Sequence, residues 1–170
     1  MFAKSAVWTT VIGAGALGAA AQAGTVTVEV ELPRLGVAEY HKPYVAGWIE
    51  DAAGAHRSNL FVWYQAGKGD KWLKDIRTWW RKSGRDLTLP QDGLTSATKA
   101  PGRQTVKFDS NSPAFKGLAA GDYVLNVEAS REGGGREVVK VPIKWDGKKA
   151  SAGAAKGASE LGDVKFAYKP

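Results

Sequence analysis

Apolar and polar residues alternate strictly in the segment 25–32. Val26, Val28, Val30 and Leu32 occupy every second position, and threonine or glutamate fills the positions between them. Successive side chains of a β-strand point to opposite faces of a sheet. The alternation therefore predicts a strand with one face in the core and the other in solvent.

Six further short segments have the composition of strands and are separated by turn sequences. The turn 51–54 (Asp-Ala-Ala-Gly) lies between the first two and predicts a hairpin, and the turn 133–135 (Gly-Gly-Gly) separates two later ones. Seven short strands with turns between them indicate a mainly β fold, an antiparallel immunoglobulin-like sandwich. The six segments are 44–50, 59–65, 104–109, 123–130, 137–145 and 164–168.

The periodicity changes in the segment 70–85. Its apolar residues recur at helical spacing and lysine and arginine occupy the other side, as in an amphipathic helix. Asp70 is placed to cap the N-terminus and Gly84 to end the helix. We therefore expect one helix inserted into the sandwich. Its apolar residues are Trp72, Leu73, Ile76, Trp79 and Trp80.

Residues 1–23 are predicted to be a signal peptide. Lys4 precedes a stretch of small and apolar residues over 6–20, and residues 21–23 (Ala-Gln-Ala) match the site that signal peptidase cleaves. The pattern indicates export to the periplasm by the general secretory route.

Composition narrows the chemistry of the mature chain, residues 24–170, which has the size of one domain. The whole chain carries a formal charge of +7, but export disfavours nucleic acid as a partner and leaves contact with an anionic membrane surface open. The absence of cysteine and the presence of only two histidines disfavour disulfides, haem and soft-metal sites. Residues 148–162, rich in alanine, glycine, serine and lysine, are expected to form a flexible connection.

Three motifs resemble a bacterial family of predicted periplasmic proteins of unknown function. They are 44–51 (YVAGWIED), 71–81 (KWLKDIRTWWR) and 127–132 (VEASRE), and the resemblance covers nearly all of the mature chain. Residues 117–123 (GLAAGDY) and the strand after them also resemble a signature of immunoglobulin-like repair and cap domains. That second resemblance implies a sandwich and says nothing of an activity.

The segment 92–98 (DGLTSAT) resembles the acceptor motif for covalent flavinylation. That motif occurs in the flavin-carrying subunits of sodium-pumping quinone reductases and in small FMN-binding domains, where a flavin transferase moves FMN from FAD onto the last hydroxyl through a phosphoester. The resemblance implies that Thr98 is the acceptor and Asp92 the acidic residue of the motif. The small central residues are Thr95, Ser96 and Ala97, and Ser96 replaces the glycine of the commonest form.

The resemblance implies a periplasmic electron carrier that bears FMN. Such a protein is a redox carrier more than a catalyst. Its partners would be the flavin transferase and a membrane flavoreductase or another periplasmic redox protein. Trp80 and Arg103 are candidates to contact the flavin, because tryptophan stacks on flat rings and arginine pairs with phosphate.

We expect most of the other aromatic and titratable residues near the motif to have structural roles. Helical spacing favours core packing for Trp72 and Trp79, whereas Trp80 points about 100° away from its neighbour and is free to border a cleft. His41 is interpreted as a loop residue in solvent, and a proton relay near a flavin is the alternative.

A second interpretation of the motif stays open. Loops rich in serine and threonine also use their hydroxyls to cap local turns. The chain would then be an immunoglobulin-like periplasmic binding or structural module without a cofactor, presenting loops or an edge strand to a partner. The sequence contains no Ser-His-Asp arrangement or paired-carboxylate spacing that would indicate a hydrolase.

Overall fold

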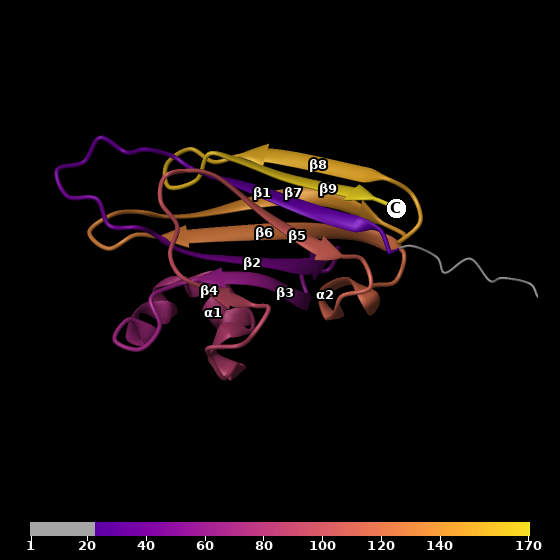
Figure 1. Cartoon of the computed structure of the whole chain (residues 1–170), viewed down its shortest axis with the longest axis horizontal. Coiled ribbons are helices and arrows are strands. Elements are labelled where there is room, and N and C mark those ends of the chain that lie inside the picture. The colour runs from indigo at the N-terminus through magenta and orange to yellow at the C-terminus, as the bar shows by residue number, and fades with distance from the viewer. Residues whose placement is uncertain (1–22) are drawn as a thin grey trace, which may run out of the picture.

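The computed structural model describes residues 23–170, so the predicted signal peptide lies outside the described residues except for its last position. Nine strands of the described chain form two sheets that face each other (Figure 1). One sheet has four antiparallel strands. Their order across the sheet is β5 (Gly102–Asp109), β1 (Thr25–Leu32), β9 (Asp163–Lys169) and β8 (Ser151–Lys156).

The second sheet has five strands. Four of them pair antiparallel, and the two-residue strand β4 pairs parallel with β3 at the edge. The predicted hairpin around residues 51–54 is present, because β2 and β3 are direct neighbours. The order is β4 (Thr95–Ser96), β3 (His56–Trp63), β2 (Tyr44–Asp51), β6 (Gly121–Ser130) and β7 (Arg136–Trp145).

The strands β1 and β2 differ in their burial pattern for a physical reason. β1 is buried at every second residue, as its alternation predicts, whereas β2 is buried along almost its whole length. Val45 and Ile49 of β2 belong to the core between the sheets, and Ala46 and Trp48 pack under the helical segment. A strand covered on both faces loses the apolar–polar alternation.

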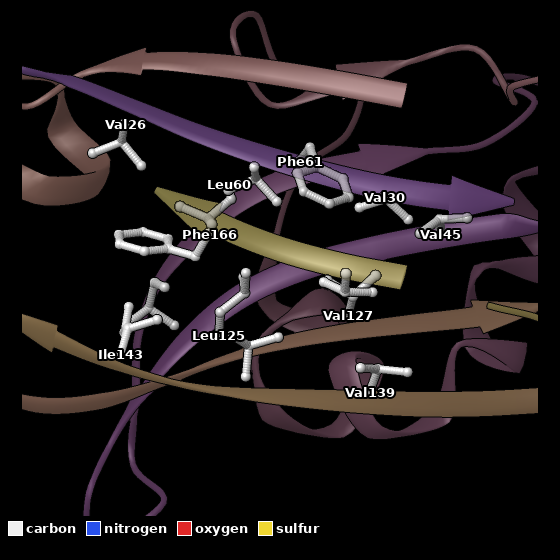
Figure 2. Close-up of a cluster of buried hydrophobic side chains, with 14 of the residues drawn as sticks. Val26, Val30, Val45, Leu60, Phe61, Leu125, Val127, Val139, Ile143 and Phe166 are labelled. Carbon is white, nitrogen blue, oxygen red and sulfur yellow. The ribbon is translucent and has the colours of Figure 1, made fainter. Parts of the chain in front are cut away.

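The main core fills the space between the two sheets (Figure 2). Val26, Val30 and Phe166 of the four-stranded sheet meet Leu125 and Val127 of the five-stranded sheet, and each is at most 1% exposed. Full burial of one such side chain contributes about 1.5–3 kcal/mol. Packing of this kind stabilises a fold that has no disulfide.

The segment predicted as one helix over 70–85 is broken into three short helices. They are the 3-10 helix η1 (Asp70–Asp75), the α-helix α1 (Arg77–Lys82) and the 3-10 helix η2 (Gly84–Asp86). Asp70 does not cap the helix as predicted; its carboxylate accepts a hydrogen bond from the Gly67 N–H, at 2.9 Å. A fourth helix, α2 (Pro113–Lys116), follows β5. No helix within residues 23–170 is long and apolar enough to cross a membrane.

The break falls at Ile76, whose backbone leaves helical geometry with φ −78° and ψ 71°. The buried Glu128 carboxylate of β6 accepts the N–H groups of Thr78 (3.1 Å) and Trp79 (2.8 Å). Free N–H groups at a helix start need such an acceptor. A new helix therefore begins directly over Glu128.

A second core lies between the broken helical segment and the outer face of the five-stranded sheet, beside β3 and β4 (Figure 1). Ile76 and Trp79 are fully buried there against Trp48 and Tyr64. The prediction that Trp79 packs in the core is confirmed. This second core holds the helices against the five-stranded sheet at one end of the sandwich.

The strand β8 corrects the expected flexible connection over 148–162. Residues 151–156 (SAGAAK) pair with β9 in continuous register, from Ser151 opposite Tyr168 to Lys156 opposite Asp163. Alanine and glycine give little contrast between buried and exposed positions, so the pattern does not reveal a strand. The mainly β antiparallel sandwich is confirmed, with nine strands in the described residues in place of about seven.

Candidate functional site

The flavinylation-like motif begins as a tight turn. The Thr95 hydroxyl accepts a hydrogen bond from the Gln91 N–H and donates one to the Gln91 carbonyl, both at 3.0 Å. Gly93 has a φ of +75°, a conformation that favours glycine. Thr95 is therefore occupied in holding the turn together.

The middle of the motif is fixed to the edge of the five-stranded sheet. The carbonyl oxygens of Leu94 and Ser96 accept hydrogen bonds from the N–H groups of Val62 (2.8 Å) and Tyr64 (2.9 Å). Leu94 is also buried in the second core. Pairing ends at Ser96, so Thr98 stands just beyond a firmly held segment.

Thr98 is half-buried and lines a cleft of about 650 Å³ at one end of the sandwich. Three other segments supply most of the remaining lining: the loop between β1 and β2, the helices η1 and α1, and the hairpin between β6 and β7. These segments lie together at the left in Figure 1, where the indigo loop and the orange hairpin project from the sheets. The cleft thus joins residues far apart in the sequence.

Trp72 borders the cleft and is 45% exposed. This corrects the prediction that it packs in the core. A 3-10 helix has about three residues per turn, and the chain breaks at Ile76, so Trp72 does not share the buried face of Leu73 and Trp79. The Lys71 ammonium lies 5.0 Å from the centre of the Trp72 ring.

The position of Trp72 depends on Gly69. The Gly69 carbonyl accepts hydrogen bonds from the Trp72 N–H (3.0 Å) and from the Tyr44 hydroxyl (3.1 Å). A Cβ atom at residue 69 would collide with the Tyr44 hydroxyl and with the Gln65 carbonyl. Glycine is therefore required where η1 meets the start of β2.

Cationic side chains outnumber anionic ones in the cleft. Two of the arginines are already paired: Arg131 with the buried Glu160, at 2.9 Å, and Arg136 with Glu128, at 2.6 Å. The hydrogen bond that Arg131 donates to the Glu160 carboxylate raises the pKa of the Arg131 guanidinium. The cationic residues are Lys42, Arg77, Arg131 and Arg136, and the anionic ones are Asp75 and Glu132.

Arg77 differs from the paired arginines. It is exposed in the first turn of α1 and forms no ion pair with any residue between 23 and 170. The attachment of α1 to Glu128 holds it at the cleft. An exposed guanidinium in a concave site is a ready partner for a phosphate group.

Two phenols and one imidazole complete the cleft. Burial raises the pKa of both Tyr40 and Tyr44, so both hydroxyls stay protonated at neutral pH. His41 is partly exposed, with Nε2 3.3 Å from a Glu39 oxygen and Nδ1 3.9 Å from a Glu132 oxygen. It thus lies at the border of the cleft and not wholly in solvent.

The structure brings only part of the predicted site together. Asp92, Ser96 and Ala97 are exposed on the motif loop, and only Thr98 of the motif lines the cleft. Trp80 packs beside Trp79 at the second core, with ring centres 6.4 Å apart. Arg103 lies on β5, with Nε 4.0 Å from a Glu29 oxygen. Neither of these two side chains borders the cleft.

The sequence pattern neither marks Trp72 as a cleft residue nor places the β6–β7 hairpin in the site. The only available signal was the glycine run at 133–135, which indicates a turn but not its neighbours. In the described chain no group of three or more histidine, cysteine, aspartate or glutamate side chains is arranged to hold a metal ion.

The fold and the cleft define a β-sandwich protein with an aromatic, basic cleft at one end. A family model described as "Predicted periplasmic protein (DUF2271)" matches residues 25–163. The chain therefore belongs to this family of predicted periplasmic proteins. Comparisons with curated proteins and with solved structures gave no significant match.

Proposed function

We propose that the protein is a periplasmic electron carrier with FMN attached to Thr98 through a phosphoester. The observation that supports this most is the position of Thr98, the last hydroxyl of the motif. It follows directly on a segment that is hydrogen-bonded to the sheet, and it lines a cleft with aromatic and cationic walls. The predicted signal peptide would export the chain, and the family description agrees with that location.

The attachment reaction balances without a further reactant. The Thr98 hydroxyl oxygen attacks the phosphorus on the FMN side of the FAD pyrophosphate. The bond from that phosphorus to the bridging oxygen breaks, AMP leaves, and the hydroxyl proton passes to a base of the flavin transferase or to water. Such a transfer needs an in-line approach at phosphorus. The segment after Ser96, free of sheet pairing, supplies a hydroxyl that a transferase can reach.

The carried flavin would cycle between oxidised FMN and reduced FMN by gaining and losing two electrons and two protons. A membrane flavoreductase or another periplasmic redox protein would deliver and remove them. The protein's own residues hold the cofactor and leave it accessible at one end of the sandwich. This role suits a carrier more than a catalyst.

The test is mass spectrometry of the exported protein made together with a flavin transferase. We expect the mature chain to gain the mass of FMN less one water, with the added mass on the peptide that contains Thr98. Thr98→Ala should remove the added mass completely. Thr105→Ala, which removes an exposed hydroxyl on β5 outside the motif, should leave it unchanged.

A flavin acceptor domain expressed in the same cells serves as the positive control. If that domain is modified while this protein keeps its unmodified mass, the flavin proposal is wrong. The alternative, a periplasmic binding or structural module without a cofactor, would then be favoured.

A further inference from the structure

We propose that the isoalloxazine ring of the Thr98-linked flavin rests in the cleft against Trp72, with its phosphodiester beside Arg77. This inference rests on the proposed attachment at Thr98 and adds where the cofactor lies. It also assigns a role to two side chains that the folded core does not use, since neither belongs to either hydrophobic cluster.

The size and reach of the cleft suit a tethered flavin. A volume of about 650 Å³ lies within the range of cofactor pockets. About seven single bonds, each near 1.5 Å, join the phosphorus to the ring, so the tether extends roughly 9 Å at most. A ring on so short a tether stays close to the walls of the cleft that Thr98 lines.

Trp72 has the properties of a stacking partner. It is the most exposed large hydrophobic side chain of the described residues, and Gly69 and Tyr44 hold the backbone that carries it. Tryptophan offers a flat apolar face that stacks on aromatic ligands. Packing within the protein leaves nearly half of the indole uncovered at 45% exposure, and a flat ligand would cover it.

Arg77 matches the charge of the linkage. Attachment turns the phosphate into a diester, which keeps one negative charge. Arg131 and Arg136 are committed to Glu160 and Glu128, which leaves Arg77 as the arginine of the cleft without an ion-pair partner among residues 23–170. The positive charge of Arg77 also favours reduced flavin, which becomes anionic when it loses the proton at N1.

The experiment uses the flavin-loaded protein and compares flavin fluorescence between variants. Stacking on tryptophan quenches flavin emission, so the loaded wild type should be dimmer than free FMN. Trp72→Leu should raise the emission at least about threefold. Trp72→Tyr should keep most of the quenching, because a flat ring remains. Val37→Ala, which trims the other exposed large hydrophobic residue, should change nothing.

A redox titration tests the role of Arg77. Arg77→Gln should lower the midpoint potential of the bound flavin, because reduced flavin loses a favourable positive charge. Arg81→Gln removes the same charge from an exposed position of α1 that does not border the cleft, so its potential should match the wild type.

The outcomes separate the two proposals. Modified Thr98 with equal emission in wild type and Trp72→Leu overturns the docking and leaves the attachment standing. An unmodified Thr98 overturns both. Circular dichroism checks folding, and if Trp72→Leu does not fold, emission from the loaded wild type as bright as that of free FMN overturns the docking in its place.

Discussion

At the scale of single residues, Glu128 connects the sheet to the candidate site. Its side chain is fully buried, and it accepts hydrogen bonds from the first turn of α1 and from Arg136. A buried carboxylate is tolerated only when donors satisfy it. Glu128 thereby fixes both the helix that carries Arg77 and the strand that begins with Arg136.

Replacing this one charge should destabilise the fold. Glu128→Gln leaves Arg136 without its ion pair and places an amide donor against the N–H groups of α1, so we expect a loss of about 2–3 kcal/mol in the free energy of unfolding. Urea denaturation measures it. Asp122→Asn, which breaks an exposed pair with Lys144, should cost less than about 0.5 kcal/mol. Equal losses in the two variants would contradict this role.

The role of Glu128 could not be predicted from the residues around it in the sequence. It stands in a strand where a glutamate ordinarily faces solvent. Its two backbone donors lie about fifty residues earlier in the chain, on a helix whose docking position the sequence pattern does not reveal. The same holds for Thr98: its residue type and motif were visible, whereas its place in the same cleft as Trp72 depends on how distant segments come together.

At the scale of elements, amphipathic patterns were reliable where residues differ strongly in hydrophobicity. The strand 25–32 was predicted to its last residue, and Trp79 packs as its helical spacing indicated. The patterns failed where tertiary contacts set the geometry. A cap from another strand broke the helix at Ile76, and pairing with β9 made a strand of residues 151–156.

The loop after β8 depends on one carboxylate. Glu137 accepts hydrogen bonds from the N–H groups of Ala158, Ser159 and Leu161 and from the Ser159 hydroxyl. Burial raises the pKa of Glu137, but these hydrogen bonds outweigh it and hold the pKa below the ordinary value of 4.5. The charged form is therefore favoured in the folded state.

This lowered pKa has a defined pH signature. Because the folded pKa lies below the unfolded one, the stabilisation is present above about pH 4.5 and is lost as the pH falls through the folded pKa. Glu137→Gln should cost about 1 kcal/mol at pH 7 and lose less stability than the wild type on acidification. Urea midpoints between neutral and acidic pH test this. Glu132→Gln, at a largely exposed side chain, should follow the wild-type curve.

At the scale of the whole molecule, stability and the proposed function occupy different parts of the protein. Both hydrophobic clusters lie against the sheets, and neither contains Thr98 or Trp72. The cleft is at the end of the sandwich opposite the chain ends, since Thr25 pairs with Lys169 at the far end of β1 (Figure 1). We therefore expect this chain to complete its fold without the proposed cofactor.

The unmodified protein should therefore fold fully without flavin. Thr98→Ala and unmodified wild type should unfold cooperatively within about 0.5 kcal/mol of each other, because the substitution lies outside both cores. Stacking on Trp72 should make the flavin-loaded protein more stable, by about 1 kcal/mol. Thiol reductants should not change the stability of the two unmodified forms, since the chain has no cysteine. Urea titrations of the three forms measure these differences.

Non-cooperative unfolding of the unmodified protein, with binding of a hydrophobic dye, would mean that the cofactor is part of the fold. A transferase acting after export would then meet a disordered chain and not a finished cleft.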